Sequence, residues 1–341
     1  MSGRVGVITT CYNEERFIET CIRSVDKQTY SDWYHIVLDD GSTDNTASIV
    51  ERFSQYNDKR KFISQNNIGQ NRSRNKGFEN LPEDIDYVIF LDGDDYLRSN
   101  ALEIGVSYLE SNSQVSVLTW VMILINEFGD VISDNHIDYY SQKRPRFGKR
   151  TVPTMFWMRD MHSRDPYTSI YSILSDCIST PTRTLMTYDS FRRSDGFTRS
   201  SVFRAGGADK MLFAKLAKNE TIHHINQGLT YHRIHDDQVT SNRSVMKRQH
   251  KLLMRRLHNM TNELEGNDRM LLIDALCFYE LRYRLPEHAR GAKDQMVRGK
   301  YVNALRILFG VAWRYVLSLF PSKVAYHIVK DRVSYHVNND T

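Results

Sequence analysis

The chain has 341 residues, which is enough to bury a large core, and its 40% hydrophobic and 26% charged residues are typical of a soluble globular protein, so a disordered chain is excluded. The four cysteines show neither CxxC spacing nor pairing with His, so we expect free thiols rather than disulfides or a zinc site. The net charge of +5 is uneven: from Arg290 onward, nine Lys or Arg residues stand against three Asp residues, which suggests a partner with a negative surface.

Four short apolar runs alternate with stretches of helical spacing in the first hundred residues. The runs predict strands at residues 4–10, 33–39, 61–65 and 86–92. In the first helical stretch, the apolar face consists of Phe17, Ile18, Cys21, Ile22 and Val25. This alternation predicts an α/β fold with a doubly wound, mostly parallel sheet and flanking helices. In such sheets the ligand crevice lies at the carboxyl ends of the strands.

Three polar clusters follow three of these strands, at residues 9–15, 38–44 and 91–97, and we therefore expect them to converge. In the second cluster, Gly41 supplies a turn and the polar residues after it can cap a helix that starts near Asn45. Those roles do not explain two adjacent carboxylates, Asp39 and Asp40. One of them, facing the crevice, could accept hydrogen bonds from a base or a ribose.

The third cluster reads DGDD and is the sharper signal, although DxD patterns also occur by chance in solvated loops. Hard divalent cations prefer carboxylate oxygens, and Asp92 and Asp94 can both reach one side of an extended turn. Gly93 between them would let a ligand approach the backbone closely. Without a cation, neighbouring carboxylates repel one another and at least one pKa rises. The pattern therefore predicts a Mg²⁺ or Mn²⁺ site.

Taken in order, residues 7–46, 66–79 and 87–102 resemble successive signatures of the family 2 inverting glycosyltransferases of the GT-A fold. The resemblance covers roughly residues 3–240. It implies a nucleotide-sugar donor, a divalent cation and a hydroxyl acceptor. In this sequence Thr10-Cys11 stands where the family usually has a proline before the tyrosine at position 12.

The resemblance also implies roles for single residues. Thr10, Tyr12 and Asp40 match positions that hold the base and ribose. Either Arg72 or Arg74 matches an arginine near the nucleotide, and the sequence leaves open which one points inward. The remaining nucleotide-binding candidates in the same motifs are Glu14, Asp92 and Gly93. The metal ligands that the resemblance implies are Asp92, Asp94 and His235, with His232 as the competing histidine.

The segment around residues 204–219 resembles the family's helix that carries the catalytic base, and this places Asp209 in that role. The usual Glu before it is Ala208 here, and the usual Trp is Phe213. The base is thus retained, while inferences about the acceptor are weakened.

Together these features predict a metal-dependent inverting transferase that moves a sugar from a nucleoside diphosphate donor, a UDP-sugar by preference, to a hydroxyl of a glycan or lipid-linked glycan. Two alternatives remain at this stage. A sugar nucleotidyltransferase would also use an α/β sheet and acidic metal ligands, but a Gly-rich phosphate loop is not found near the first strand. A non-catalytic nucleotide- or glycan-binding assembly partner is favoured only by Ala208. Nucleic acid is not an expected partner, because the basic residues form no known reading motif.

We place the catalytic domain at residues 1–244 and a helical C-terminal extension at residues 245–341. Residues 303–320 have the spacing of an amphipathic helix. Such a helix could pack on the catalytic domain or on a second copy in a homodimer, or it could lie on the inner face of a membrane. Because the N-terminal residues enter an apolar strand at once, we expect a cytoplasmic protein with peripheral membrane contact as an option.

Overall fold

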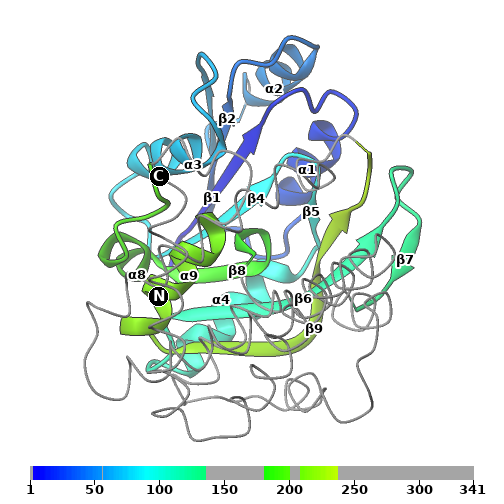
Figure 1. Ribbon diagram of the computed structural model, residues 1–341. Helices are drawn as coiled ribbons and strands as arrows, with labels where there is room; N and C mark the ends of the chain where they lie inside the picture. The colour runs from blue at the N-terminus through cyan, green and yellow to red at the C-terminus, as the bar shows by residue number, and fades with distance from the viewer. Residues whose placement is uncertain (1–2, 56, 136–179, 200–207, 237–341) are drawn as a thin grey trace, which may run out of the picture. The chain divides into compact units, whose positions relative to one another are not determined.

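The computed structural model describes residues 3–55, 57–135, 180–199 and 208–236 (Figure 1). The strands of this part are β1 (Val5–Cys11), β2 (Trp33–Asp39), β3 (Arg60–Ser64), β4 (Tyr87–Asp92), β5 (Tyr96–Leu97), β6 (Val117–Ile125), β7 (Val131–Ser133), β8 (Thr184–Thr187) and β9 (Ile222–Arg233). The α-helices are α1 (Ile18–Asp26), α2 (Thr46–Ser54), α3 (Gln70–Glu79), α4 (Ala101–Ser111), α8 (Tyr188–Arg193) and α9 (Ala208–Asn219), and a 3₁₀ turn, η1, spans Pro181–Arg183.

The described strands form one sheet in the order β3-β2-β1-β4-β8-β6-β9-β5, with β7 paired to β6. The first four strands of this order are parallel, and β6 is parallel to β9. β8 is antiparallel to both β4 and β6, so it joins the parallel half to the second half of the sheet. The carboxyl ends of β1, β2 and β4 therefore meet at one edge, as the alternation of strands and helices predicts.

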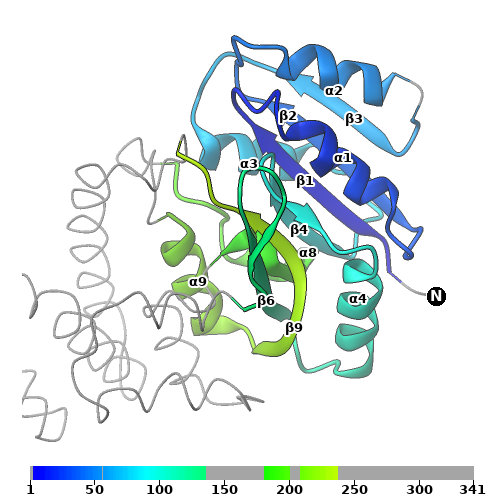
Figure 2. The ribbon, with the colours of Figure 1, turned by 90° about the vertical axis from the view of Figure 1, so that its right-hand side faces the viewer.

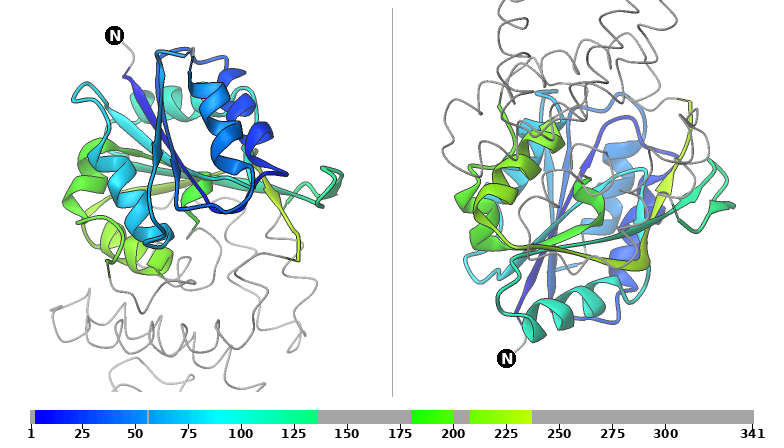
Figure 3. Two further views of the ribbon diagram at one scale, coloured as in Figure 1. Left: turned by 90° about the horizontal axis from the view of Figure 1, so that it is seen from above. Right: turned by 60° about the horizontal axis from the view of Figure 1, so that its bottom comes forward.

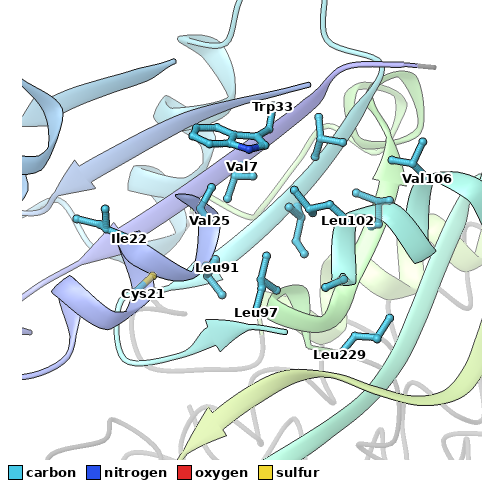
Figure 4. Close-up of a cluster of buried hydrophobic side chains, with 14 of the residues drawn as sticks. Val7, Cys21, Ile22, Val25, Trp33, Leu91, Leu97, Leu102, Val106 and Leu229 are labelled. Carbon is cyan, nitrogen blue, oxygen red and sulfur yellow. The ribbon is translucent and has the colours of Figure 1, made fainter. Parts of the chain in front are cut away.

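Helices cover both faces of the sheet (Figure 3). Alternate residues of β1 and β4 point to opposite faces, because the side-chain period of a strand is two. Val7 and Leu91 pack with α1 and α4 in one apolar cluster, which Figure 4 shows together with Trp33 of β2 and Leu229 of β9. The other face carries Phe90, whose ring contacts Phe191 of α8, and Ile8, which lies against Gly77 of α3. Figure 2 shows the sheet between these helices from the side.

The strands predicted from apolar runs agree with β1 to β4 within one residue at each end, and the predicted helix over residues 17–25 is α1. The doubly wound α/β class is thereby confirmed. Cys11 and Cys21 are buried and free, as expected. Every helix in the described ranges is too short or too polar to cross a lipid bilayer. The predicted domain boundary, the extension at 245–341 and the helix at 303–320 lie outside the described residues.

Candidate active site

The acidic cluster lies where β4 ends, on the edge that the parallel strands share. Thr10 pairs in register with Asp92, so both side chains lie on the α3 face of the sheet. One carboxylate oxygen from each of Asp92, Asp94 and Asp95 lies within 4.8 Å of the other two. Three negative charges this close would repel strongly, and the sequence predicts that a cation must separate them.

Protein side chains already supply positive or hydrogen-bonding partners to this cluster. The guanidinium of Arg74 contacts Asp92 at 2.6 Å, and Nε2 of His235 lies 3.2 Å from Asp94. Nδ1 of His232 lies 3.0 Å from the fully buried carboxylate of Asp95. Each carboxylate therefore has its own partner within the protein, and the predicted rise of at least one pKa is found at Asp95. A metal would bind to a cluster that is held in place beforehand.

The electrostatics of the cluster follow from these pairings. Burial raises the pKa of Asp95 to about 6, although His232 opposes the shift. Burial lowers the pKa of His232, but the Asp95 carboxylate outweighs it and brings the pKa to about 9. Burial likewise raises the pKa of Asp94, but the hydrogen bond from His235 and the nearby histidines hold it below its usual range. At neutral pH the Asp95–His232 pair is thus ionised, and Asp94 is a carboxylate.

Glu14, from the loop after β1, forms no ion pair with any of the described residues. Burial, followed by the charges of Asp94, Asp92 and Asp95, raises the pKa of Glu14 to about 9. Single ligand atoms of Glu14, Asp94 and His235 lie within 4.8 Å of one another. Carboxylates suit Mg²⁺ and Mn²⁺, and imidazole is a ligand of divalent transition metals, so this trio fits a divalent cation. The predicted contact of Glu14 with the nucleotide stays a prediction.

Asp209 lies in the first turn of α9 and meets the cluster through one arginine. The guanidinium of Arg74 contacts Oδ1 of Asp209 at 2.9 Å with one amino group and Asp92 with the other. The Arg74 side chain is 3% exposed, whereas that of Asp209 is 33% exposed. Partial burial raises the pKa of Asp209, and Arg74 opposes this shift. The predicted base is therefore within one side chain of the predicted metal motif.

The two candidate arginines of α3 lie in different environments. Arg74 points into the cluster, whereas Arg72 is exposed and its Nε donates to the carbonyl of Arg199. Residues three or four positions apart lie on the same face of a helix, so two residues that are two positions apart point in different directions. Arg74 is the arginine that faces the acidic cluster.

The adjacent carboxylates Asp39 and Asp40 also diverge. Asp39 accepts from the backbone and hydroxyl of Ser42. Asp40 is buried, and it accepts from the amides of Ile68 and Gly69 and from the side chain of Gln65. Asp40 thus fixes the loop that enters α3. Its predicted contact with a base or ribose stays a prediction.

The remaining predicted residues lie along the same edge. Tyr12 is 47% exposed. Thr10 is buried, and its hydroxyl is without a hydrogen-bond partner among the described residues. A side chain at Gly93 would come within 2.9 Å of Cβ of Cys11, so close packing explains this glycine. The predicted approach of a ligand to Gly93 stays a prediction.

Sequence reasoning missed Arg233, which links the acidic cluster to the turn between β6 and β7 by hydrogen bonds. Its Nε donates to the Asp94 carbonyl, and one amino group donates to the carbonyls of Asn126 and Glu127 in the turn between β6 and β7. Its backbone N–H donates to Asp95. The available signal was its position between His232 and His235, the two histidines that pair with the cluster.

Known proteins resemble this chain in sequence and in fold. Residues 6–170 match the family described as Glycosyl transferase family 2. Glycosyltransferase GlyA of Streptococcus pneumoniae is 34% identical over 103 residues, which are 30% of this chain and 14% of GlyA. The chain spans less than half the length of the curated relatives that it matches.

Solved structures extend the likeness to most of the chain. S. aureus TarS 1-349 in complex with UDP-GlcNAc has a TM-score of 0.52 at 16% identity and covers 89% of this chain and 90% of its own. Mannosyltransferase PcManGT from Pyrobaculum calidifontis, in complex with GDP-Man and Mn²⁺, has a TM-score of 0.59 at 15% identity and covers 96% and 87%. At these identities the likeness concerns the fold. Residues 6–170 thus match glycosyltransferase family 2, and the described residues have the GT-A fold.

Proposed function

We propose that this protein is a metal-dependent inverting glycosyltransferase, which moves a sugar from a nucleoside diphosphate donor to a hydroxyl of a glycan or lipid-linked glycan. The observation that carries the proposal lies at the carboxyl edge of the sheet. There a single arginine, Arg74, contacts both Asp209 and Asp92 of the DGDD cluster. A nucleotide sugar is supported as the donor class by TarS and PcManGT, whose structures hold UDP-GlcNAc and GDP-Man. We favour a uridine nucleotide.

The cation would be held by Asp94 and His235, with carboxylate oxygens of Glu14 and Asp92 close to Asp94. Mn²⁺ or Mg²⁺ fits this oxygen-rich set, and PcManGT holds Mn²⁺. When bound, such an ion neutralises the charge that develops on a departing diphosphate. Asp95 is committed to His232 and Arg233, so we assign it to holding the cluster rather than to coordination.

Asp209 would act as the general base. Its Oδ1 contacts Arg74, which leaves Oδ2 of a one-third exposed side chain to take the proton of an acceptor hydroxyl. An ionised carboxylate within about 3 Å of that hydroxyl would suffice. One displacement then inverts the anomeric carbon, and the enzyme needs no nucleophile of its own. Ala208 is 1% exposed, so the residue that replaces the usual Glu does not reach an acceptor from this position.

A donor screen tests the proposal. The full chain is incubated with Mn²⁺ and, separately, UDP-glucose, UDP-galactose, UDP-N-acetylglucosamine and GDP-mannose, and released nucleoside diphosphate is measured. We expect release from at least one donor, with loss of release on adding excess EDTA. Release of pyrophosphate would identify a nucleotidyltransferase instead. Binding of the nucleotide without release from any donor would favour a non-catalytic partner.

A further inference from the structure

Arg74 is placed to do more than neutralise charge. Its two terminal amino groups are divided between Asp92 at the end of β4 and Asp209 at the start of α9. These two carboxylates are 117 positions apart in the sequence and belong to the donor side and the acceptor side of the proposed site. A planar guanidinium has fixed donor directions, so a bond at each amino group fixes the two carboxylates relative to each other.

The arginine itself is held rigidly. Its guanidinium lies 5.1 Å from the centre of the Phe197 ring. The next residue, Asn75, donates to the carbonyl of Phe197 and accepts from its amide, at 2.8 and 2.9 Å. Gly196, at a φ of +60°, leaves no room for a side chain because Oδ1 of Asn75 would lie 2.7 Å from its Cβ. Helix α3 and the turn at residues 194–197 therefore form one fixed support for Arg74.

The engagement of Arg74 argues against a direct grip on the nucleotide. Both amino groups are bound to carboxylates, and Nε is buried without a partner among the described residues. No exposed edge of the guanidinium is left for a phosphate, since the side chain is 3% exposed. We propose that Arg74 is a positioning residue that fixes the Asp209 carboxylate relative to Asp92, so that the base is aligned with the donor. This inference rests on the proposed function and assigns a new role within that site.

The first test needs no turnover and follows the carboxyl group of Asp209. The charged groups that act on it are Arg74 of α3, Asp92 of β4 and Lys210 of α9. The protein is labelled with ¹³C at aspartate carboxyl carbons, and the Asp209 signal is identified by its loss in Asp209→Asn. We expect Arg74→Met to raise the titration midpoint of this signal by about one unit or more, because an adjacent arginine stabilises the carboxylate. Arg72→Met, on the exposed side of the same helix, should leave it unchanged.

The second test separates positioning from donor binding. We expect Arg74→Met to lower kcat for hydrolysis of UDP-N-acetylglucosamine with Mn²⁺ by about 10²-fold, while the Kd of UDP with Mn²⁺ stays within about twofold. Arg74→Lys carries one ammonium that cannot hold both carboxylates, so it should recover the fold and only part of kcat. If Arg74→Met fails to fold, the kcat and UDP affinity of Arg74→Lys decide whether Arg74 positions Asp209.

The outcomes distinguish this role from the proposed function. An unshifted Asp209 midpoint in Arg74→Met, or a loss confined to UDP affinity with kcat intact, would overturn the positioning role. If the parent protein hydrolyses no UDP-N-acetylglucosamine, that donor is excluded, and the carboxyl titration still decides whether Arg74 controls Asp209.

Discussion

Two groups of buried polar residues lie in the same sheet and are built differently. The first lies in the interior, where Nε of Arg60 donates to Nδ1 of His35. A terminal amino group of the same guanidinium pairs with Asp26. Because arginine always donates, Nδ1 of His35 must accept, and Nε2 therefore carries the proton that is donated to Thr9. From Thr9 the chain of contacts continues through Cys21 to the backbone carbonyl of Asp92.

The second group is the acidic edge above that chain. Here Asp92, Asp94 and Asp95 also have partners, but the Thr10 hydroxyl and Nδ1 of His235 are without hydrogen bonds among the described residues. Buried polar groups are normally satisfied, and exceptions call for an explanation such as a ligand. The interior network thus pairs its polar atoms and stabilises the fold, whereas the edge holds unpaired polar atoms that a ligand could contact.

Loss of the proposed base should have the largest effect, because the edge then loses its catalytic carboxylate while the interior network is unchanged. We expect Asp209→Asn to lower donor turnover by about 10²- to 10⁴-fold. Binding of UDP with Mn²⁺ should change little, since the amide keeps the shape of the side chain. Steady-state kinetics and calorimetry measure the two quantities. Asp189→Asn, in a surface ion pair of α8, is the control and should behave as the parent does.

Loss of a metal ligand should act on binding instead. We expect Asp94→Ala to weaken UDP binding in the presence of Mn²⁺ by about 10-fold or more, and to abolish the benefit that Mn²⁺ gives. Calorimetry with and without Mn²⁺ measures this, with the exposed Asp58→Ala as the matched control. Equal affinity in Asp94→Ala and the parent would show that Asp94 is not a ligand.

The interior network should respond in stability and leave binding unchanged. Arg60→Met removes the partner of His35 and of Asp26, and the Asp26 side chain is one-third exposed. We expect a loss of about 2–4 kcal/mol in the free energy of unfolding. Arg52→Met removes an exposed ion pair and an exposed contact with the Phe53 ring, and should cost less than about 1 kcal/mol. Urea unfolding measures both. If Arg60→Met lost no more stability than Arg52→Met, the interior network would not be a stabilising element.

The smallest effect concerns pH. Burial, and then the charge of Arg60, hold the pKa of His35 well below its usual range. The unfolded chain binds this proton below a pH of about 6.5, whereas the folded protein does not, so the contribution of His35 to stability falls as pH decreases through that value. The slope attributable to His35 is at most about 1.4 kcal/mol per pH unit. The free energy of unfolding, measured with urea at pH 7, 6 and 5, should therefore fall less steeply with decreasing pH in His35→Gln than in the parent. Identical slopes would contradict this assignment.

The fold could be predicted well from local patterns because the first four strands are short apolar runs that end in turn residues. Trp33–Asp39 was predicted to the residue. The antiparallel strand β8 could not be found in this way, since Thr184–Thr187 is four residues long and its pairing with β4 and β6 joins segments far apart in sequence. Non-local pairing leaves little local signal.

The site shows the same division. Asp92 and Asp94 follow from a pattern of three residues after a strand, and Asp209 from a family resemblance. Their partners could not be predicted, because Arg74 reaches Asp209 across 135 positions and His232 reaches Asp95 across 137. The choice between Arg72 and Arg74 likewise depends on helical phase, which the structure provides.

The location of a bound metal ion decides whether Asp94 and His235 form the cation site. Crystals of the full chain grown with UDP and Mn²⁺ would be measured by anomalous diffraction at the manganese edge. We expect a manganese peak within about 2.0–2.6 Å of oxygen or nitrogen atoms of Asp94 and His235, with the diphosphate on the same ion. A peak elsewhere, or UDP bound away from the edge formed by Asp92 and Asp209, would contradict the account.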